Sequence, residues 1–134
     1  MFERKKPSPQ KRIDSLIGAG TTVDGDVTFT GGLRIDGSVR GCVTAQDSEP
    51  ATLVLSEQAR IDGEVRVSHV VINGTVHGPV IARDYLELQA EARVNGDVTY
   101  RSLEMHVGAV VHGKLSHAEQ ETAAIVELKR ASAE

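Results

Sequence analysis

Residues 53–65 read LVLSEQARIDGEV, and this stretch decides the fold because it returns twice along the chain. Residues 86–98 read LELQAEARVNGDV and residues 103–115 read LEMHVGAVVHGKL, and all three align without a gap. Apolar residues occupy the same alternating positions in each copy, and glycine occupies the same position near its end. Alternation with period two is typical of strands that bury one face. The middle of the chain is therefore built from a repeated strand unit.

The last five positions of this unit form a phrase, apolar-x-Gly-x-apolar, that also occurs outside the three long copies. Its glycines are Gly25, Gly37, Gly63, Gly74, Gly96 and Gly113. Most of them directly follow Asp or Asn. A sharp corner between strands often needs a residue with positive φ, which glycine adopts without strain, and Asp or Asn tolerates the neighbouring position. We therefore assign these glycines to structural corners.

The spacing of the corners predicts the architecture. Successive glycines of the phrase lie 12, 26, 11, 22 and 17 residues apart, near multiples of five to six except where the polar insertion 45–52 intervenes. Three short strands would close a turn of about seventeen residues, which is the offset between Leu86 and Leu103. The predicted fold is all-β, a single-stranded, three-faced parallel β-helix (a β-solenoid) of about six turns over residues 15–115.

A set of β-hairpins is the alternative, because two-residue hairpin turns use the same Asp-Gly and Asn-Gly pairs. Hairpins, however, give no reason for the units to recur in step about every seventeen residues. The solenoid is therefore the prediction, and the spacings leave its handedness open.

The composition excludes several classes of protein. Aromatic residues are only 3% of the 134 residues, whereas a platform that stacks nucleic-acid bases needs exposed rings. No apolar run approaches the ~20 residues of a transmembrane helix. The single cysteine, Cys42, cannot form an internal disulfide or a Cys-rich zinc site, which fits a reducing compartment. We expect it to be a small, buried or half-buried strand residue.

Charge divides the chain into three segments. Residues 1–12 carry a net charge of +4, residues 13–115 carry −6 and residues 116–134 carry −2. We expect a basic, flexible N-terminal tail over residues 1–14, a β-helix domain over 15–115, and a C-terminal tail over 116–134 that is a short helix or disordered. The acidic body would repel phosphate, so no nucleic-acid partner is expected.

The arginines of the body are expected on its outer faces, because most of them lie beside apolar positions. They are Arg34, Arg40, Arg60, Arg66, Arg83, Arg93 and Arg101. Since acidic residues are interleaved with them, we expect solvated cross-strand ion pairs. A docking face for a partner protein is the alternative use of this surface.

Function is expected to follow from the two ends of the solenoid. The first and last turns of a solenoid expose unpaired strand edges and an open apolar core, which soluble solenoids usually cover with polar caps. The last unit, 103–115, is as apolar as the interior ones. We therefore expect end-to-end self-assembly, with an interface made by Ile17 and Val23 at one end and Val110, Val111 and Leu115 at the other.

The rival class is an enzyme on a left-handed β-helix, either a hexapeptide-repeat acyltransferase or a carbonic-anhydrase-like zinc trimer, which needs three converging histidines. His77 and His112 share the slot before a glycine but lie 35 residues apart, about two turns or roughly 10 Å along the axis. With Asn95 near the intervening turn, both cannot ligate one ion. The sequence also lacks a Ser-His-Asp set, a phosphate loop and a paired-carboxylate motif. We therefore expect no enzymatic activity, cofactor, nucleotide or metal site.

The chain also resembles a known family. Residues 1–6 read MFERKK and residues 17–27 read IGAGTTVDGDV. With the repeated Ile-Asp-Gly-x-Val phrase, these residues resemble the bactofilins over about residues 1–115. The resemblance implies a right-handed, three-faced β-helix that polymerises end to end, without nucleotide, into non-polar cytoskeletal filaments. It also implies a bacterial scaffold, peripheral on the cytoplasmic face of the inner membrane, that recruits cell-wall synthetic or hydrolytic enzymes.

The first six residues, which we call the basic head, have features of a membrane-binding segment. Phe2 can insert its ring at a lipid interface while the basic residues after it lie against anionic headgroups. Each basic residue there contributes about 1 kcal/mol, so a monomer would bind weakly and a filament with many heads would bind firmly. A disordered, solubilising tail is the alternative from the residues alone. The family motif implies membrane binding by Met1, Phe2, Arg4, Lys5 and Lys6.

Overall fold

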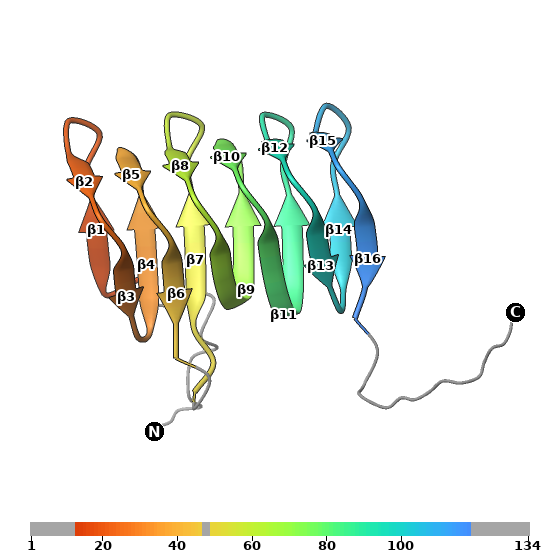
Figure 1. Ribbon diagram of the computed structural model, residues 1–134, viewed down its shortest axis with the longest axis horizontal. Helices are drawn as coiled ribbons and strands as arrows, with labels where there is room; N and C mark the ends of the chain where they lie inside the picture. The colour runs from red at the N-terminus through yellow and green to blue at the C-terminus, as the bar shows by residue number, and fades with distance from the viewer. Residues whose placement is uncertain (1–12, 47–48, 119–134) are drawn as a thin grey trace, which may run out of the picture.

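The structure is a computed structural model that describes residues 13–46 and 49–118. Over these residues the chain is all-β and winds into a parallel β-solenoid whose six turns follow one another along the long axis (Figure 1). The turns run in chain order from the first strand at one end to the last strand at the other (Figure 1). The shape is therefore a short rod with two distinct ends.

Each turn contributes three strand segments. The first turn holds β1 (Ser15–Ile17), β2 (Thr22–Asp24) and β3 (Val27–Phe29), and the second holds β4 (Gly32–Ile35), β5 (Ser38–Arg40) and β6 (Val43–Ala45). The third holds β7 (Thr52–Leu55), β8 (Arg60–Asp62) and the first half of β9 (Val65–Ile72). The fourth holds the second half of β9, β10 (Thr75–His77) and the first half of β11 (Val80–Leu88). The fifth holds the second half of β11, β12 (Arg93–Asn95) and β13 (Val98–Tyr100), and the sixth holds β14 (Leu103–Met105), β15 (Val110–His112) and β16 (Leu115–His117).

Strands in equivalent places pair in parallel and form three stacks. The first stack contains β1, β4, β7, the second halves of β9 and β11, and β14. The second contains β2, β5, β8, β10, β12 and β15. The third contains β3, β6, the first halves of β9 and β11, β13 and β16.

The predicted solenoid of about six turns is confirmed. The seventeen-residue offset also holds, since β11 and β14 pair with Leu86 opposite Leu103. The right-handed winding stays a prediction from the resemblance.

Aliphatic side chains from successive turns form columns inside the coil. In the second stack, Val39, Ile61, Val76 and Val94 lie in register, and each has an exposed fraction of 0%. Burying one such side chain contributes roughly 1.5–3 kcal/mol. These inward columns therefore hold the turns together, which explains the period-two pattern of the sequence.

A column of glycines forms the corner between the second and third stacks. Its φ angles lie between 137° and 159°, where side chains other than glycine are strained. In each turn after the first, a Cβ on this glycine would collide with the carbonyl of the corner glycine one turn earlier. The column consists of Gly25, Gly41, Gly63, Gly78, Gly96 and Gly113. Backbone therefore stacks directly on backbone at this corner.

Two of the predicted corner glycines lie at a different corner. Gly37 and Gly74 lie between the first and second stacks, and they are absent from the positive-φ glycines. A Cβ on Gly37 would meet the carbonyl oxygens of Gly18 and Thr21 in the turn before. Close approach, rather than positive φ, is thus the reason for glycine here. The same five-residue phrase marks two different corners.

The corner between the third and first stacks carries the insertion. β9 and β11 pass this corner without a break, whereas β6 ends at Ala45 and β7 begins only at Thr52. The Ala51 amide donates to the Ser68 hydroxyl (2.8 Å), and that hydroxyl donates to the Ala51 carbonyl (2.8 Å). This buried pair fastens the end of the insertion to the next turn.

Gly96→Val should destabilise the protein more than Gly25→Val. Both glycines have positive φ (155° and 137°), where another residue costs about 1–3 kcal/mol, but only Gly96 lies against a preceding turn. The clash with Gly78 should lower Tm further, as measured by circular dichroism during heating. Arg66→Val, on an outer face, is the control and should change Tm little. Equal losses from both glycine variants would contradict direct stacking at this corner.

Candidate functional site

The N-terminal end of the rod exposes part of its core. Ile17 and Val23 occupy the inward slots that Ile35 and Val39 occupy one turn later. Ile35 and Val39 have an exposed fraction of 0%, whereas Ile17 and Val23 are only half-buried. The two residues that the sequence assigned to assembly therefore lie at an incompletely covered end of the core.

The C-terminal end shows the same loss of burial. Val111 is half-buried and Leu115 is 42% exposed, whereas their counterparts one turn earlier, Val94 and Val98, are 0% exposed. The structure places the third predicted residue differently, because Val110 occupies the outward slot that belongs to Arg93 in the preceding turn. Val110 therefore lies on an outer face beside the open core.

Two further apolar side chains at this end were missed by the sequence analysis. Met105 is 44% exposed and Val107 is 96% exposed. Both lie in the sixth turn, at or after β14. The sequence does carry a signal, because the corner after residue 105 contains the apolar Val107. The equivalent corner after Leu88 reads Gln-Ala-Glu and has no large apolar residue.

The outer strand edges at both ends have no partner strand in the described part of the chain. Within the described residues, β1, β2 and β3 pair only with the second turn, and β14, β15 and β16 pair only with the fifth. Each end therefore presents three short edges of backbone donors and acceptors around exposed apolar side chains. Unpaired edges of this kind are templates for pairing with another chain.

The predicted membrane-binding residues lie outside the described part of the chain. They are Met1, Phe2, Arg4, Lys5 and Lys6. The predicted C-terminal tail is likewise described only as far as residue 118. None of the described residues belongs to a helix with the length and hydrophobicity that a membrane span requires.

Several ion pairs on the outer faces of the described residues join residues two apart in the chain. Arg34 Nε lies 2.9 Å from Asp36 Oδ1, and this hydrogen bond lowers the pKa of Asp36. Arg60–Asp62 (3.3 Å) and Arg66–Glu64 (2.9 Å) have the same spacing. A pair between turns joins Arg40 and Asp24 (3.4 Å). The expected cross-strand pairing is therefore found there, while the others neutralise charge locally.

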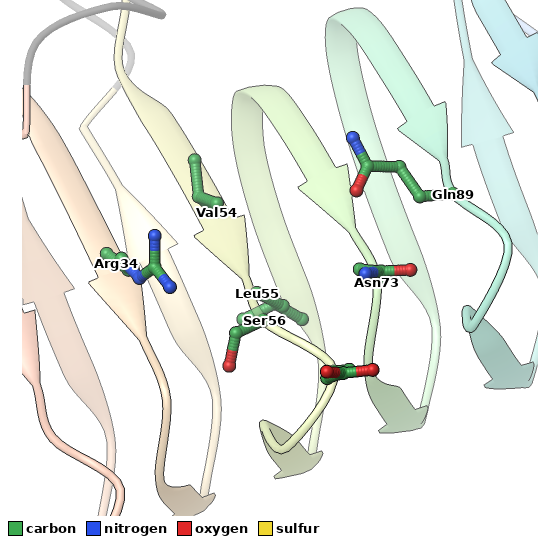
Figure 2. Close-up of a pocket in the computed structure, with 7 residues that line it drawn as sticks. Arg34, Val54, Leu55, Ser56, Asn73 and Gln89 are labelled. Atoms are coloured by element: carbon green, nitrogen blue, oxygen red, sulfur yellow. The ribbon is translucent and has the colours of Figure 1, made fainter.

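A shallow groove follows the first stack where its strands meet the next corner (Figure 2). Figure 2 shows polar side-chain ends from four successive turns, with Val54 and Leu55 between them. The lining residues are Arg34, Val54, Leu55, Ser56, Glu57, Asn73 and Gln89. The groove is open and mixed in polarity, so it does not enclose a small molecule.

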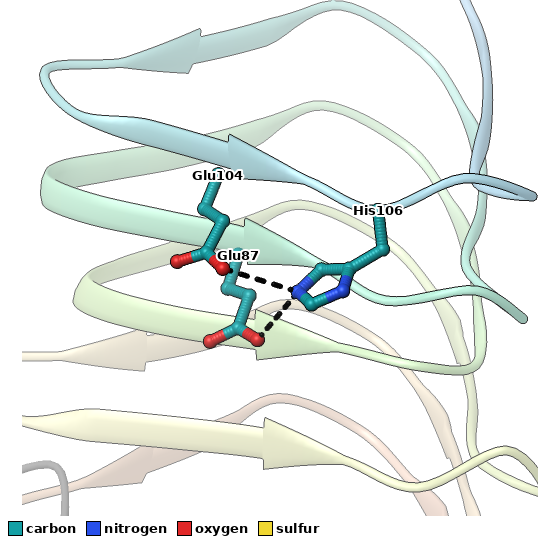
Figure 3. A group of neighbouring side chains, drawn as sticks. All are labelled: Glu87, Glu104 and His106. Atoms are coloured by element: carbon teal, nitrogen blue, oxygen red, sulfur yellow. Dashed lines mark hydrogen bonds and ion pairs between the residues drawn. The ribbon is translucent and has the colours of Figure 1, made fainter.

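A cluster of acidic residues, one tyrosine and one histidine spans the fifth and sixth turns (Figure 3). Glu87 and Glu104 occupy paired outward slots of β11 and β14. His106, directly after β14, places its Nε2 atom 3.0 Å from Glu87 Oε2 and 3.4 Å from Glu104 Oε2. We call these three residues, with Tyr85, the Glu87–His106 cluster.

Tyr85 supports both carboxylates of the cluster from the other side. Its hydroxyl donates to Glu104 Oε1 (2.8 Å) and lies 3.3 Å from Glu87 Oε1. Desolvation and the two neighbouring carboxylates raise the pKa of Tyr85 far above its ordinary value. The phenol therefore stays protonated and remains a donor. Sequence analysis missed this cluster, although the aligned units LEL and LEM place both glutamates in one slot.

The histidines assessed in the sequence lie as expected. In the second stack, Asn95 pairs with His77 on one side and His112 on the other. The Asn95 Nδ2 atom is 3.1 Å from His77 Nδ1. Asn95 therefore lies in the turn between the two histidines, which are two turns apart.

The geometry defines a class of protein. It is a β-solenoid whose surfaces for contact lie at two open ends and along its outer faces. The chain belongs to the bactofilin family, because the family model, described as polymer-forming cytoskeletal, matches residues 15–116. The match begins at the first residue of β1 and ends within β16.

Two bactofilins of Myxococcus xanthus (strain DK1622) are similar to this chain. Bactofilin BacO is 26% identical over 102 residues, which cover 76% of this chain and 78% of BacO. Bactofilin BacP is 25% identical over 116 residues, which cover 86% of this chain but only 47% of BacP. No solved structure matches the chain significantly.

Tyr85→Phe should reduce the loss of stability at alkaline pH. Because the pKa of Tyr85 is raised in the folded state, the protonated phenol stabilises the fold below about pH 10, the unfolded value, and this contribution declines as pH rises further. Urea unfolding between pH 9 and pH 11.5 should therefore show a shallower decline for the variant than for the wild type. Tyr100→Phe is the matched control. Identical slopes for the Tyr85 variant and the wild type would contradict the raised pKa.

Proposed function

We propose that this chain is a bacterial cytoskeletal scaffold that assembles end to end into non-polar filaments, without nucleotide, at the cytoplasmic face of the inner membrane. There it localises proteins of cell-wall synthesis, cell-wall hydrolysis or morphogenesis. It acts as a structural protein and not as an enzyme. The observation that carries the proposal is the loss of burial at both ends, where inward slots that are fully covered in interior turns become exposed.

End-to-end contact would complete what each terminal turn lacks. A second copy would pair with the three free strand edges and cover Ile17 and Val23 at one end, or Val111 and Leu115 at the other. Membership in a polymer-forming family supports this use of the ends. Burying both the edges and the apolar slots would favour assembly without an energy source.

Two arrangements of copies would pair the strand edges and cover the apolar side chains at the ends. Head-to-tail contacts continue the parallel stacks and give a polar filament. In the other arrangement, head-to-head contacts alternate with tail-to-tail contacts, and every second copy is turned over. The strands at each junction then run antiparallel, and each contact is self-complementary. We propose the second arrangement, which the family resemblance supports.

Membrane attachment is proposed through the basic head. The β-helix domain is less suited to anionic lipids, because residues 13–115 carry a net charge of −6. Residues 1–12 carry +4 and include Phe2. A filament would present many such heads on one surface, so weak individual contacts would add up to firm attachment.

The pair Val111→Lys and Leu115→Lys should stop growth at dimers. In the non-polar arrangement, the new charges repel each other across the two-fold contact, while the N-terminal turns can still join two copies. A head-to-tail polymer would fall to monomers instead. Light scattering after size-exclusion chromatography separates the two outcomes, and circular dichroism checks the fold.

The control for this pair places the same charges in interior turns. Ser38→Lys with Thr75→Lys adds two outward lysines to the second stack and should leave filaments long in electron microscopy. Filaments of normal length from the folded Val111 and Leu115 double variant would remove the C-terminal turn from the interface.

Deleting residues 1–6 should abolish flotation with anionic liposomes and leave filaments intact. The deletion removes Phe2 and the basic residues after it, but none of the described strands. The assembly-deficient double variant should show weakened flotation even with its head present, because avidity is lost. Flotation that survives the deletion would place the membrane contact elsewhere. Loss of filaments would instead assign the head to the assembly interface.

A further inference from the structure

We propose that Glu87, Glu104 and His106 form a binding site for a divalent transition-metal ion, with Zn²⁺ as its best-fitting occupant. The three side chains each offer one ligand atom, and these atoms all lie within 4.8 Å of one another. Figure 3 shows the imidazole of His106 directed at the two stacked carboxylates. The site lies on an outer face of the fifth and sixth turns, and it does not depend on the proposed assembly.

The distances between the ligand atoms suit a small tetrahedral ion. Zinc bonds to imidazole nitrogen and carboxylate oxygen are about 2.0–2.2 Å long, so neighbouring ligands of a tetrahedral site lie about 3.3–3.5 Å apart. His106 Nε2 lies 3.0 Å from Glu87 Oε2 and 3.4 Å from Glu104 Oε2. Small side-chain shifts would therefore suffice to admit the ion, with water as its fourth ligand.

The donor set selects the class of metal. A histidine nitrogen with two carboxylates is typical of zinc and its first-row neighbours, whereas Mg²⁺ and Ca²⁺ prefer oxygen ligands alone and more of them. A +2 ion would also relieve the repulsion between two glutamates that the parallel register places opposite each other. One imidazole carries at most a single positive charge, so it cannot neutralise both carboxylates.

The residues around the donors hold them in place. The Tyr85 hydroxyl contacts the Oε1 atoms of both glutamates, at 2.8 Å from Glu104 and 3.3 Å from Glu87. The Oε2 atoms are the ones that face His106. Such outer contacts orient metal ligands in known sites. The Gln89 amide, which donates to Glu87 Oε2 (3.2 Å), would give way or bond to the other oxygen.

Metal binding would tie the last turn to the rest of the rod. Glu87 belongs to the fifth turn, and Glu104 and His106 belong to the sixth. The sixth turn, like the first, has partly exposed inward side chains, so less packing holds it than holds an interior turn. A bound ion would add a cross-link between turns at that place.

The test uses the full chain and the metal alone. Calorimetric titration with ZnCl₂ should give one site per chain, and Co²⁺ should give the visible absorption of a four-coordinate ion, which Zn²⁺ then displaces. His106→Gln and Glu104→Gln should each weaken Zn²⁺ binding at least tenfold and abolish the Co²⁺ absorption. His112→Gln removes an exposed histidine of the same turn and should leave both signals within twofold of the wild type.

Thermal unfolding provides a second readout. Saturating Zn²⁺ should raise Tm of the wild type and of His112→Gln, but not of His106→Gln, while Mg²⁺ should raise none of them. Three outcomes would overturn the site: no Zn²⁺ binding at millimolar concentration, equal binding by wild type and His106→Gln, or a Co²⁺ spectrum that the Glu104 variant retains. In the last two cases the ion binds elsewhere.

Discussion

The fold depends on how closely one turn can approach the next at a single corner. In the column of glycines between the second and third stacks, the backbone of each turn lies directly on the backbone of the turn before, with no room for a Cβ. Any side chain there would push the turns apart and break the parallel hydrogen bonds on both sides of the corner. The apolar columns supply most of the stabilising free energy, but the glycines allow the spacing at which those columns meet. Contacts are then almost entirely between neighbouring turns, so stability and exposure are set turn by turn.

This nearest-neighbour organisation explains why the candidate functional surfaces lie where they do. An interior turn has a partner above and below, so its inward side chains are covered and its edges are paired. In the described part of the chain, a terminal turn has the same sequence pattern but only one neighbouring turn. In the proposed assembly, an ordinary repeat residue such as Val111 would therefore join the interface because it lies at an end, without a specialised interface motif.

The repeat made the turn count, the strand periodicity and the inward residues predictable from the sequence, because alternation and glycine spacing are local properties of the chain. What the spacing could not distinguish was one corner from another. Gly37 and Gly63 stand in the same phrase, yet only Gly63 has positive φ. The stacking glycines Gly41 and Gly78 stand in the same phrase too, within Val39–Val43 and Val76–Val80, but the sequence analysis did not assign them to corners. The Glu87–His106 cluster was predictable in part. The aligned units place both glutamates in one slot, but the direction of His106 depends on the conformation of the corner that follows β14.

The continuity of the chain through the turns has a mechanical consequence for any filament built from it. Within one chain, tension along the axis is carried by hydrogen bonds of three stacks acting side by side, and the covalent backbone also runs from each turn to the next. At a junction between two chains the backbone connection is missing, and only non-covalent contacts between terminal turns bear the load. A stretched filament would therefore fracture between chains and leave each rod folded, so that broken ends are already competent to rejoin.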